Sequence, residues 1–272
     1  MAIKLLVTDM DGTLLGKDGY VSPRNRGALE RVKQQGVKIV LASGRMTESM
    51  LPCARVLGVN APMIAYNGAV IYDMAQSKIR HQTLIPMHWA RALCETAENM
   101  GLHVQAYQHD GYYAAASNRY TKLYAAAIHH PEPHMTDRPL SGWINADQIK
   151  LLIIDEPKIV AHVTPILAEM FEGRIQCVDS QPNYIECIAI GAEKGLALRR
   201  VAEEMGILPD EIVAFGDAGN DIGMLSYAGL SYAMEGASDK VKNAADRVAP
   251  PAHRDGIACA IEELLGERRF FN

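Results

Sequence analysis

The chain has 272 residues, a net charge of −5 and no block of lysine and arginine, which disfavours nucleic-acid and membrane partners and leaves small molecules. Its five cysteines are scattered without a C-x-x-C pair, which argues against a zinc site and a disulfide framework. No apolar run approaches a membrane span, so we expect a soluble cytoplasmic protein, whose oligomeric state the sequence does not indicate.

The first predicted element is a short buried strand, residues 3–7, which is followed by the sequence TDMDGTL. Asp9 and Asp11 stand two residues apart in this sequence. Side chains at positions i and i+2 of an extended chain point to the same side, so both carboxylates should project toward a common point. Two such charges repel, and a divalent cation, a lysine or a shared proton would have to compensate them.

The next segment predicts a helix that begins after the N-cap Ser22 and stops at Gly36. Residues 37–42 form a continuous apolar strand, typical of a sheet that helices cover on both faces. Strand, helix and strand in this order imply a right-handed parallel crossover. Residues 62–73 predict a further strand with a turn at Asn67, which precedes a glycine.

The pattern changes between residues 81 and 190. Two longer helical patterns, residues 87–100 and 157–171, and a loop rich in proline and histidine, residues 129–139, separate the candidate strands there. Those strands are HVQAY, GYYAAA, KLLIID, RIQCVDS and NYIECIAI. This order of elements predicts an α+β unit inserted into the first domain.

After the insertion, helix and strand alternate again, with strands at 211–217 and 230–234. The predicted fold class is therefore α/β. A doubly wound, Rossmann-like core with a parallel sheet would comprise residues 1–80 and 191–272, and an α+β cap would comprise residues 81–190.

Polar groups follow the predicted core strands, where an open α/β sheet binds its ligands. Asp9 and Asp11 follow the first strand, and SGR follows the second. The sequence GDAGND follows the strand at 211–217, and Lys194 begins the helix before that strand. Each signal is modest alone, but their order along the chain is specific.

In this order the motifs resemble those of the haloacid dehalogenase superfamily, and within it the Cof-type sugar-phosphatase-like branch with a large inserted cap. DMDGTL is similar to the first motif, Ser43 in LASGR to the second, Lys194 in EKG to the third, and GDAGND to the fourth. The similarity covers nearly the whole chain, including YNGA and GIACAIEELL. One departure is Glu235-Gly236-Ala237, where family members often carry an asparagine before the alanine; none of the four motifs is affected.

The resemblance implies a Mg²⁺-dependent phosphatase that acts on a small phosphorylated metabolite, with a sugar phosphate as first expectation. Asp9 would attack phosphorus and form an aspartyl-phosphate, and Lys194 with Mg²⁺ would carry the phosphoryl charge. The Mg²⁺ ligands would be Asp9, the backbone carbonyl of Asp11, Asp217 and, directly or through water, Asp221. Because paired carboxylates raise one pKa, the Asp11 side chain, off the metal, would be the general acid and base.

The remaining predicted site residues would bind phosphate or substrate. Ser43 and nearby backbone N–H groups would hold the phosphoryl oxygens. Arg45 would hold substrate or pair with a carboxylate, and Asn67 would shape its turn or contact substrate. This set comprises Met10, Ser43, Gly44, Arg45, Asn67 and Asn220.

Other functions remain open at this point. A phosphomutase-type phosphotransferase would use the same residues, and the sequence does not separate it from a hydrolase. A non-enzymatic, receiver-like phosphoacceptor also pairs aspartates, a metal, a hydroxyl and a lysine, but it is half this length or less and has its acceptor after a middle strand.

Three other enzyme classes are disfavoured. No G-x-G-x-x-G follows any predicted strand, against a dinucleotide enzyme. A dehalogenase would not need the second acidic cluster, and no short cap with a lysine follows the first motif, as a phosphonate hydrolase would have. The histidines at 109, 129, 130 and 134 lack metal-ligand spacing and are expected to be loop residues.

Overall fold

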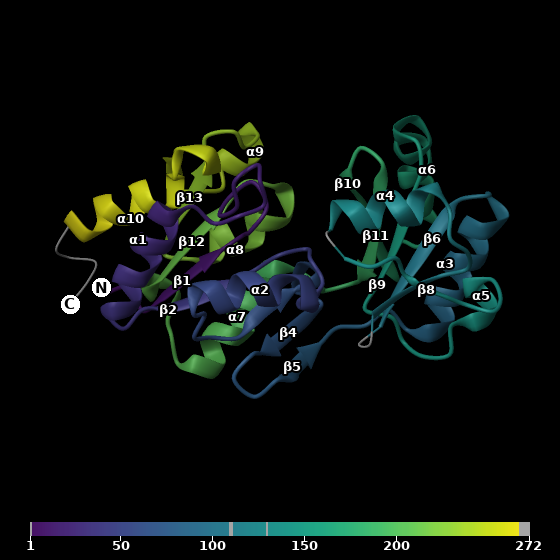
Figure 1. Ribbon diagram of the computed structural model, residues 1–272, viewed down its shortest axis with the longest axis horizontal. Coiled ribbons are helices and arrows are strands. Elements are labelled where there is room, and N and C mark those ends of the chain that lie inside the picture. The colour runs from purple at the N-terminus through teal and green to yellow at the C-terminus, as the bar shows by residue number, and fades with distance from the viewer. Residues whose placement is uncertain (1, 109–110, 129, 267–272) are drawn as a thin grey trace. The chain divides into compact units, whose positions relative to one another are not determined.

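The computed structural model describes residues 2–108, 111–128 and 130–266, apart from the side chains at 179 and 180. The chain divides into two compact units: Met1–His81 with Glu193–Asn272, and Gln82–Ala192. We call the first unit the core and the second the cap (Figure 1). Among the described residues, no helix combines the length and the apolar character that crossing a bilayer requires.

The core is built on a five-stranded parallel sheet in the order β14-β13-β12-β1-β2. Its strands are β1 (Leu5–Thr8), β2 (Lys38–Leu41), β12 (Ile212–Gly216), β13 (Leu230–Met234) and β14 (Arg247–Ala249). From β1 the chain runs to β2 on one side, while β12 lies on the other, so the strand order reverses at β1. An open sheet of this kind binds ligands at such a reversal, beyond the carboxyl ends of the strands.

A three-stranded sheet continues from β2 through a parallel bridge between Ala42 and Ile64. It consists of β3 (Met63–Ala65), β4 (Val70–Asp73) and β5 (Lys78–Gln82). The segment predicted as one strand with a turn is thus two short antiparallel strands, β3 and β4, joined by the turn η1 (Tyr66–Gly68).

Helices cover both faces of the core sheet, because right-handed crossovers that proceed in opposite directions place their helices on opposite faces. On one face α1 packs against α10, and on the other α7 packs against α8. The core helices are α1 (Pro23–Gln34), α2 (Thr47–Leu57), α7 (Lys194–Met205), α8 (Ile222–Tyr227), α9 (Asp239–Lys242) and α10 (Gly256–Gly266), with short 3₁₀ turns η2 (Pro209–Glu211), η3 (Gly219–Asp221) and η4 (Ala252–Arg254).

The start and end of α1 are as predicted. The Ser22 hydroxyl accepts a hydrogen bond from the Asn25 N–H at 3.0 Å, which satisfies one of the free donors of the first turn. Gly36, just beyond the helix, has φ of +85°, a conformation that glycine adopts without steric cost. The helix α2 was not predicted, because Pro52 lies within it and proline ordinarily indicates a helix boundary.

The cap contains a six-stranded sheet in the order β10-β11-β9-β6-β7-β8. All neighbouring strands are antiparallel except β7 and β8. The strands are β6 (His103–Gln108), β7 (Gly111–Ala114), β8 (His134–Met135), β9 (Lys150–Ile154), β10 (Ile175–Gln181) and β11 (Tyr184–Ala189), and the helices are α3 (Met87–Asn99), α4 (Arg119–Ala127), α5 (Leu140–Trp143) and α6 (Pro157–Met170).

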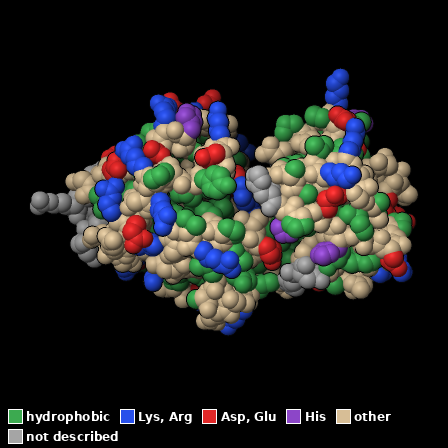
Figure 2. All heavy atoms as spheres, viewed as in Figure 1, with side chains coloured by type: hydrophobic (Ala, Val, Ile, Leu, Met, Phe, Trp, Pro, Cys, Tyr) green, Lys and Arg blue, Asp and Glu red, His purple; other side chains and the backbone are tan. Residues whose placement is uncertain are grey.

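The predicted fold class is confirmed: a parallel-sheet core carries an additional α+β unit with its own sheet. Of the cap elements, β8, α4 and α5 were not predicted. Acidic and basic side chains are mixed over the face of the molecule that Figure 2 shows. Of the four histidines expected in loops, His130 lies outside helices and strands, but His134 lies in β8, which pairs with β7. His109 and His129 lie outside the described residues.

Candidate active site

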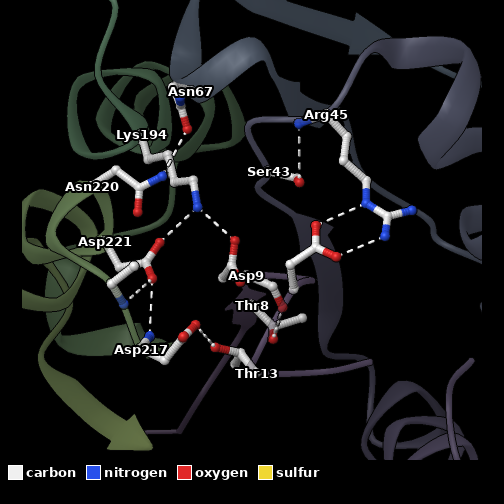
Figure 3. Close-up of polar contacts among 12 residues, drawn as sticks. Thr8, Asp9, Thr13, Ser43, Arg45, Asn67, Lys194, Asp217, Asn220 and Asp221 are labelled. Atoms are coloured by element: carbon white, nitrogen blue, oxygen red, sulfur yellow. Dashed lines mark hydrogen bonds and ion pairs between the residues drawn. The ribbon is translucent and has the colours of Figure 1, made fainter. Parts of the chain in front are cut away.

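The carboxyl ends of β1 and β12 bring together three acidic side chains from distant parts of the sequence (Figure 3). Asp9 follows β1 and Asp217 follows β12, and the Asp9 N–H donates to the Phe215 carbonyl at 3.0 Å. Asp9, Asp217 and Asp221 each offer a carboxylate oxygen within 4.8 Å of the others. The parallel register of the two strands therefore places these acidic groups in one cluster.

Lys194, the first residue of α7, joins two of these carboxylates. Its Nζ donates to Asp9 Oδ1 at 2.6 Å and to Asp221 Oδ1 at 2.7 Å, and its side chain is 1% exposed. Burial opposes the charged form of Lys194, but the charges of Asp9 and Asp221 outweigh burial and raise its pKa. Lys194 is therefore a buried ammonium that points at the candidate nucleophile.

The charges in this cluster are not balanced by the protein alone. Three carboxylates face one ammonium, which leaves an excess of negative charge. Burial raises the pKa of Asp9 well above its ordinary value, and the Lys194 ammonium only partly opposes this shift; burial also raises the pKa of Asp217. A divalent cation would relieve this repulsion, and all-oxygen donors are the set that Mg²⁺ prefers, so the residues present fit Mg²⁺.

The three carboxylates differ in how many of their oxygens are already bonded. Asp221 is fully buried, and while Oδ1 accepts from Lys194, Oδ2 accepts from the N–H groups of Asp217 and Ala218 at 2.9 and 3.0 Å. Within the described residues, Asp9 and Asp217 each accept only one side-chain hydrogen bond. Asp9 and Asp217 are thus the stronger candidates for direct metal ligands. Asp221 instead accepts hydrogen bonds from Lys194 and from the backbone of the segment 217–218.

Asp11 does not join this cluster, which corrects the expectation that Asp9 and Asp11 project toward a common point. β1 ends at Thr8 and the chain bends at Met10, so the alternation of an extended strand no longer applies at Asp11. Its carboxylate, 56% exposed, instead accepts from Arg45 Nε at 2.7 Å and Nη2 at 2.6 Å. Of the two roles expected for Arg45, the structure shows the pairing with a carboxylate.

The second motif lies beside the first because β2 neighbours β1, and the Ala42 N–H donates to the Thr8 carbonyl at 2.9 Å. Ser43 is buried, and its Oγ accepts from the Arg45 N–H at 3.2 Å, which leaves the hydroxyl proton available to a ligand. The Met10 side chain is buried, so only its backbone could contact a ligand. Phosphate binding by Met10, Ser43 and Gly44 stays a prediction.

The family assignment follows from a match over most of the chain. Residues 6–261 match the family described as haloacid dehalogenase-like hydrolase. This chain belongs to that family. The resemblance seen in the four motifs is therefore confirmed.

Relatives of this haloacid dehalogenase-like hydrolase include named phosphatases and solved structures. The Bacillus subtilis (strain 168) protein named 5-amino-6-(5-phospho-D-ribitylamino)uracil phosphatase YcsE is 30% identical over 267 residues, which cover 97% of this chain and 96% of that protein. A haloacid dehalogenase-like hydrolase from Bacteroides thetaiotaomicron superposes with a TM-score of 0.88 at 30% identity, covering 96% of this chain and 99% of that one. TM0651 from Thermotoga maritima superposes with a TM-score of 0.86 at 33% identity, covering 96% and 97%.

The chain is accordingly an enzyme, a phosphatase of the haloacid dehalogenase-like hydrolases. Its phosphatase relatives indicate phosphorylated small molecules as substrates. The match favours an enzyme over the receiver-like alternative.

Two residues outside the predicted site set, Gly12 and Thr13, shape the geometry of the candidate metal ligand Asp217. Thr13 Oγ1 donates to Asp217 Oδ1 at 2.7 Å, which orients a candidate ligand from the other strand. Gly12 lies directly against the same carboxylate, and a Cβ at this position would clash with it. The signal was present in the D-G-T sequence, because only glycine allows both the positive φ and the close approach.

Proposed function

We propose that this phosphatase requires Mg²⁺ and hydrolyses a small phosphorylated metabolite, with a sugar phosphate as the first candidate, through an aspartyl-phosphate on Asp9. The observation that carries the proposal is the buried contact of Asp9 with Lys194, beside Asp217 and Asp221 at the carboxyl ends of β1 and β12. A phosphate monoester is an anion, so a carboxylate nucleophile can approach it only where positive charge is concentrated.

Asp9 is the attacking group, because the phosphoryl group that it accepts can then be held by neighbours already in place. Lys194 donates to Asp9 in the structure and stabilises the charge on the phosphoryl oxygens as phosphorus changes partners. Mg²⁺ bound by Asp9 and Asp217 would supply further charge neutralisation and orient the phosphoryl group. The Ser43 hydroxyl and the backbone N–H groups near Met10 and Gly44 donate to the remaining oxygens.

Asp11 protonates the departing alkoxide and then removes a proton from the water that attacks the aspartyl-phosphate. Its side chain lies outside the buried carboxylate cluster, which supports this role, since a metal-bound carboxylate is a poor proton carrier. In the structure Arg45 donates to both oxygens of the Asp11 carboxylate, which favours its ionised form. Asp11 therefore acts as the acid after it leaves Arg45 and takes up a proton from solvent, to which its side chain is exposed.

The cap selects the substrate in this proposal, because the residues assigned to phosphoryl transfer all come from the core. The name of the Bacillus subtilis relative indicates a phosphorylated ribityl compound. That compound therefore belongs beside the sugar phosphates in a substrate panel.

The test is a phosphate-release assay over this panel with Mg²⁺ or with a chelator. We expect release only with Mg²⁺, none from Asp9→Asn, and strongly slowed release from Asp11→Asn, which should still form some phosphoenzyme with good leaving groups. Asp239→Asn, at an exposed aspartate of the core, is the matched control and should keep full activity. Full activity of Asp9→Asn would overturn the proposal.

The same assay separates hydrolysis from phosphotransfer. A hydrolase accumulates inorganic phosphate with water as the only acceptor. Release that appears only when a second hydroxyl compound is added would instead indicate the phosphomutase-type alternative.

A further inference from the structure

The turn η1 contacts the segments that carry three of the four motifs. We propose that Asn67, in this turn, and Asn220 are positioning residues that tie the Asp217–Asp221 loop to the Ser43–Arg45 segment, so that their contact sets the metal-ligand geometry; this inference rests on the proposed function. The sequence had suggested Asn220 as a substrate contact and Asn67 as either a turn residue or a substrate contact, whereas in the structure the two side chains bond to each other.

The turn is first bonded to the second motif through its backbone. The Tyr66 N–H donates to the Arg45 carbonyl and the Asn67 N–H to the Ser43 carbonyl, each at 3.0 Å. The Asn67 amide also lies against Gly44, where a Cβ would be 3.0 Å from Asn67 Oδ1. The turn and the Ser43–Arg45 segment should therefore move together.

The turn is also packed against the segment that precedes Lys194. A Cβ on Gly68 would clash with the backbone of Glu193, so these two segments of the chain approach each other more closely than a residue with a side chain would permit. Any shift of the turn would reach the first residue of α7, whose ammonium holds Asp9.

The backbone of the turn is in an uncommon conformation. Tyr66, Asn67 and Gly68 have φ of 51°, 56° and 100°, and the first two are not glycines. Such residues persist only where surrounding contacts hold them, and they concentrate at functional sites. Here the surrounding contacts include those to the second and third motifs.

Within the part of the chain that the structure describes, a side-chain hydrogen bond joins the turn to the fourth motif, as Figure 3 shows. Asn220 Nδ2 donates to Asn67 Oδ1 at 2.8 Å. Residues 218–220 are exposed, so apolar packing does not hold this part of the loop. Asn220 precedes Asp221, whose Oδ2 accepts from the Asp217 and Ala218 N–H groups. Loss of the contact between the asparagines should therefore loosen the backbone that presents Asp217.

A double-mutant cycle with Asn67→Gly, Asn220→Ala and the double variant tests the inference. Glycine at 67 removes the amide and keeps the positive φ without strain, and Asn220 is exposed, so all variants should fold. Asn243→Ala, at an exposed asparagine of the core, is the control. The readouts are hydrogen exchange of a peptide that spans residues 212–225, Mg²⁺ affinity by calorimetry, and kcat and KM.

We expect each single variant to speed exchange at the Asp217 and Ala218 amides by roughly fivefold and to weaken Mg²⁺ binding by about tenfold. The kcat should fall while KM for substrate changes little. The double variant should be no more impaired than the more impaired of the two single variants, because each substitution removes the same hydrogen bond.

The inference would be overturned if hydrogen exchange and Mg²⁺ affinity stayed unchanged while KM rose in each single variant and the two increases multiplied in the double variant. Both asparagines would then be assigned to substrate binding. The exchange measurement needs neither Mg²⁺ nor substrate. Unchanged exchange thus refutes the positioning contact alone, whereas absence of Mg²⁺-dependent phosphate release by the unaltered enzyme refutes the proposed function.

Discussion

His103, in the cap, should make the stability of that unit depend on pH. Its Nδ1 lies 3.0 Å from Asn118 Nδ2. Asn118 Oδ1 already accepts from two backbone N–H groups at the start of α4, so its NH₂ faces Nδ1, while Gln105 Nε2 lies 3.2 Å from the ring Nε2. Both amide NH₂ groups disfavour an added proton on the ring. Protonation would set two donors against each other. Burial lowers the pKa of His103 to about 4, and the Asp155 charge opposes this only in part.

The sign and size of the effect follow from the two states. An exposed imidazole in the unfolded chain has a pKa of about 6.5, so between pH 6.5 and about 4 the unfolded chain binds a proton that folded His103 does not. Stability is therefore lost as the pH falls through this window. Between pH 7.5 and pH 5.0 the loss from this one group amounts to about 2 kcal/mol, an upper value because the ring is partly exposed.

The variant His103→Asn keeps an acceptor for Asn118 and removes the titrating ring. The chain has two tryptophans, Trp89 and Trp143, and both lie in the cap, so tryptophan fluorescence during urea unfolding reports on this unit. Between pH 7.5 and 5.0 the unaltered protein should lose about 2 kcal/mol more than His103→Asn. His162→Gln, at an exposed histidine of the cap, is the control and should follow the unaltered protein. An equal loss in His103→Asn would refute the reasoning.

Two further predictions concern the core. Thr13→Val removes the hydroxyl that orients Asp217 and should weaken Mg²⁺ binding, measured by calorimetry, by about tenfold or more. Thr13→Ser keeps the hydroxyl and should bind Mg²⁺ nearly as well as the unaltered protein. Equal Mg²⁺ affinities of the two variants would contradict the role of the hydroxyl. Lys194→Met leaves two buried carboxylates without the ammonium that pairs with them and should lower the free energy of unfolding by about 3 to 5 kcal/mol. Circular dichroism during unfolding without Mg²⁺ measures this change. An unchanged unfolding transition would show that these carboxylates do not depend on the lysine.

Elements whose signals are local could be predicted from the sequence. The N-cap residue Ser22 and the glycine at position 36 mark the start and the end of α1, because such residues satisfy or redirect the helix backbone within a few positions. The helix α2 was missed for the same reason, since Pro52 is a local signal against a helix that tertiary packing overrides. In the cap, α4 begins with a capping box at Asn118 and Thr121, which lacks the usual acidic residue and was overlooked.

The sequence by itself determined which residue types stand at the strand ends, and so the gathering of Asp9 and Asp217 with Asp221, because a parallel sheet brings the carboxyl ends of its strands to one edge. It also placed Lys194 at the start of the helix that precedes β12. Only the tertiary structure decided how each polar atom is used. The pairing of Asp11 with Arg45, and of Asn67 with Asn220, joins residues distant in the chain through hydrogen bonds. Such bonds depend on backbone turns and side-chain directions a few ångströms apart, which no spacing along the sequence specifies.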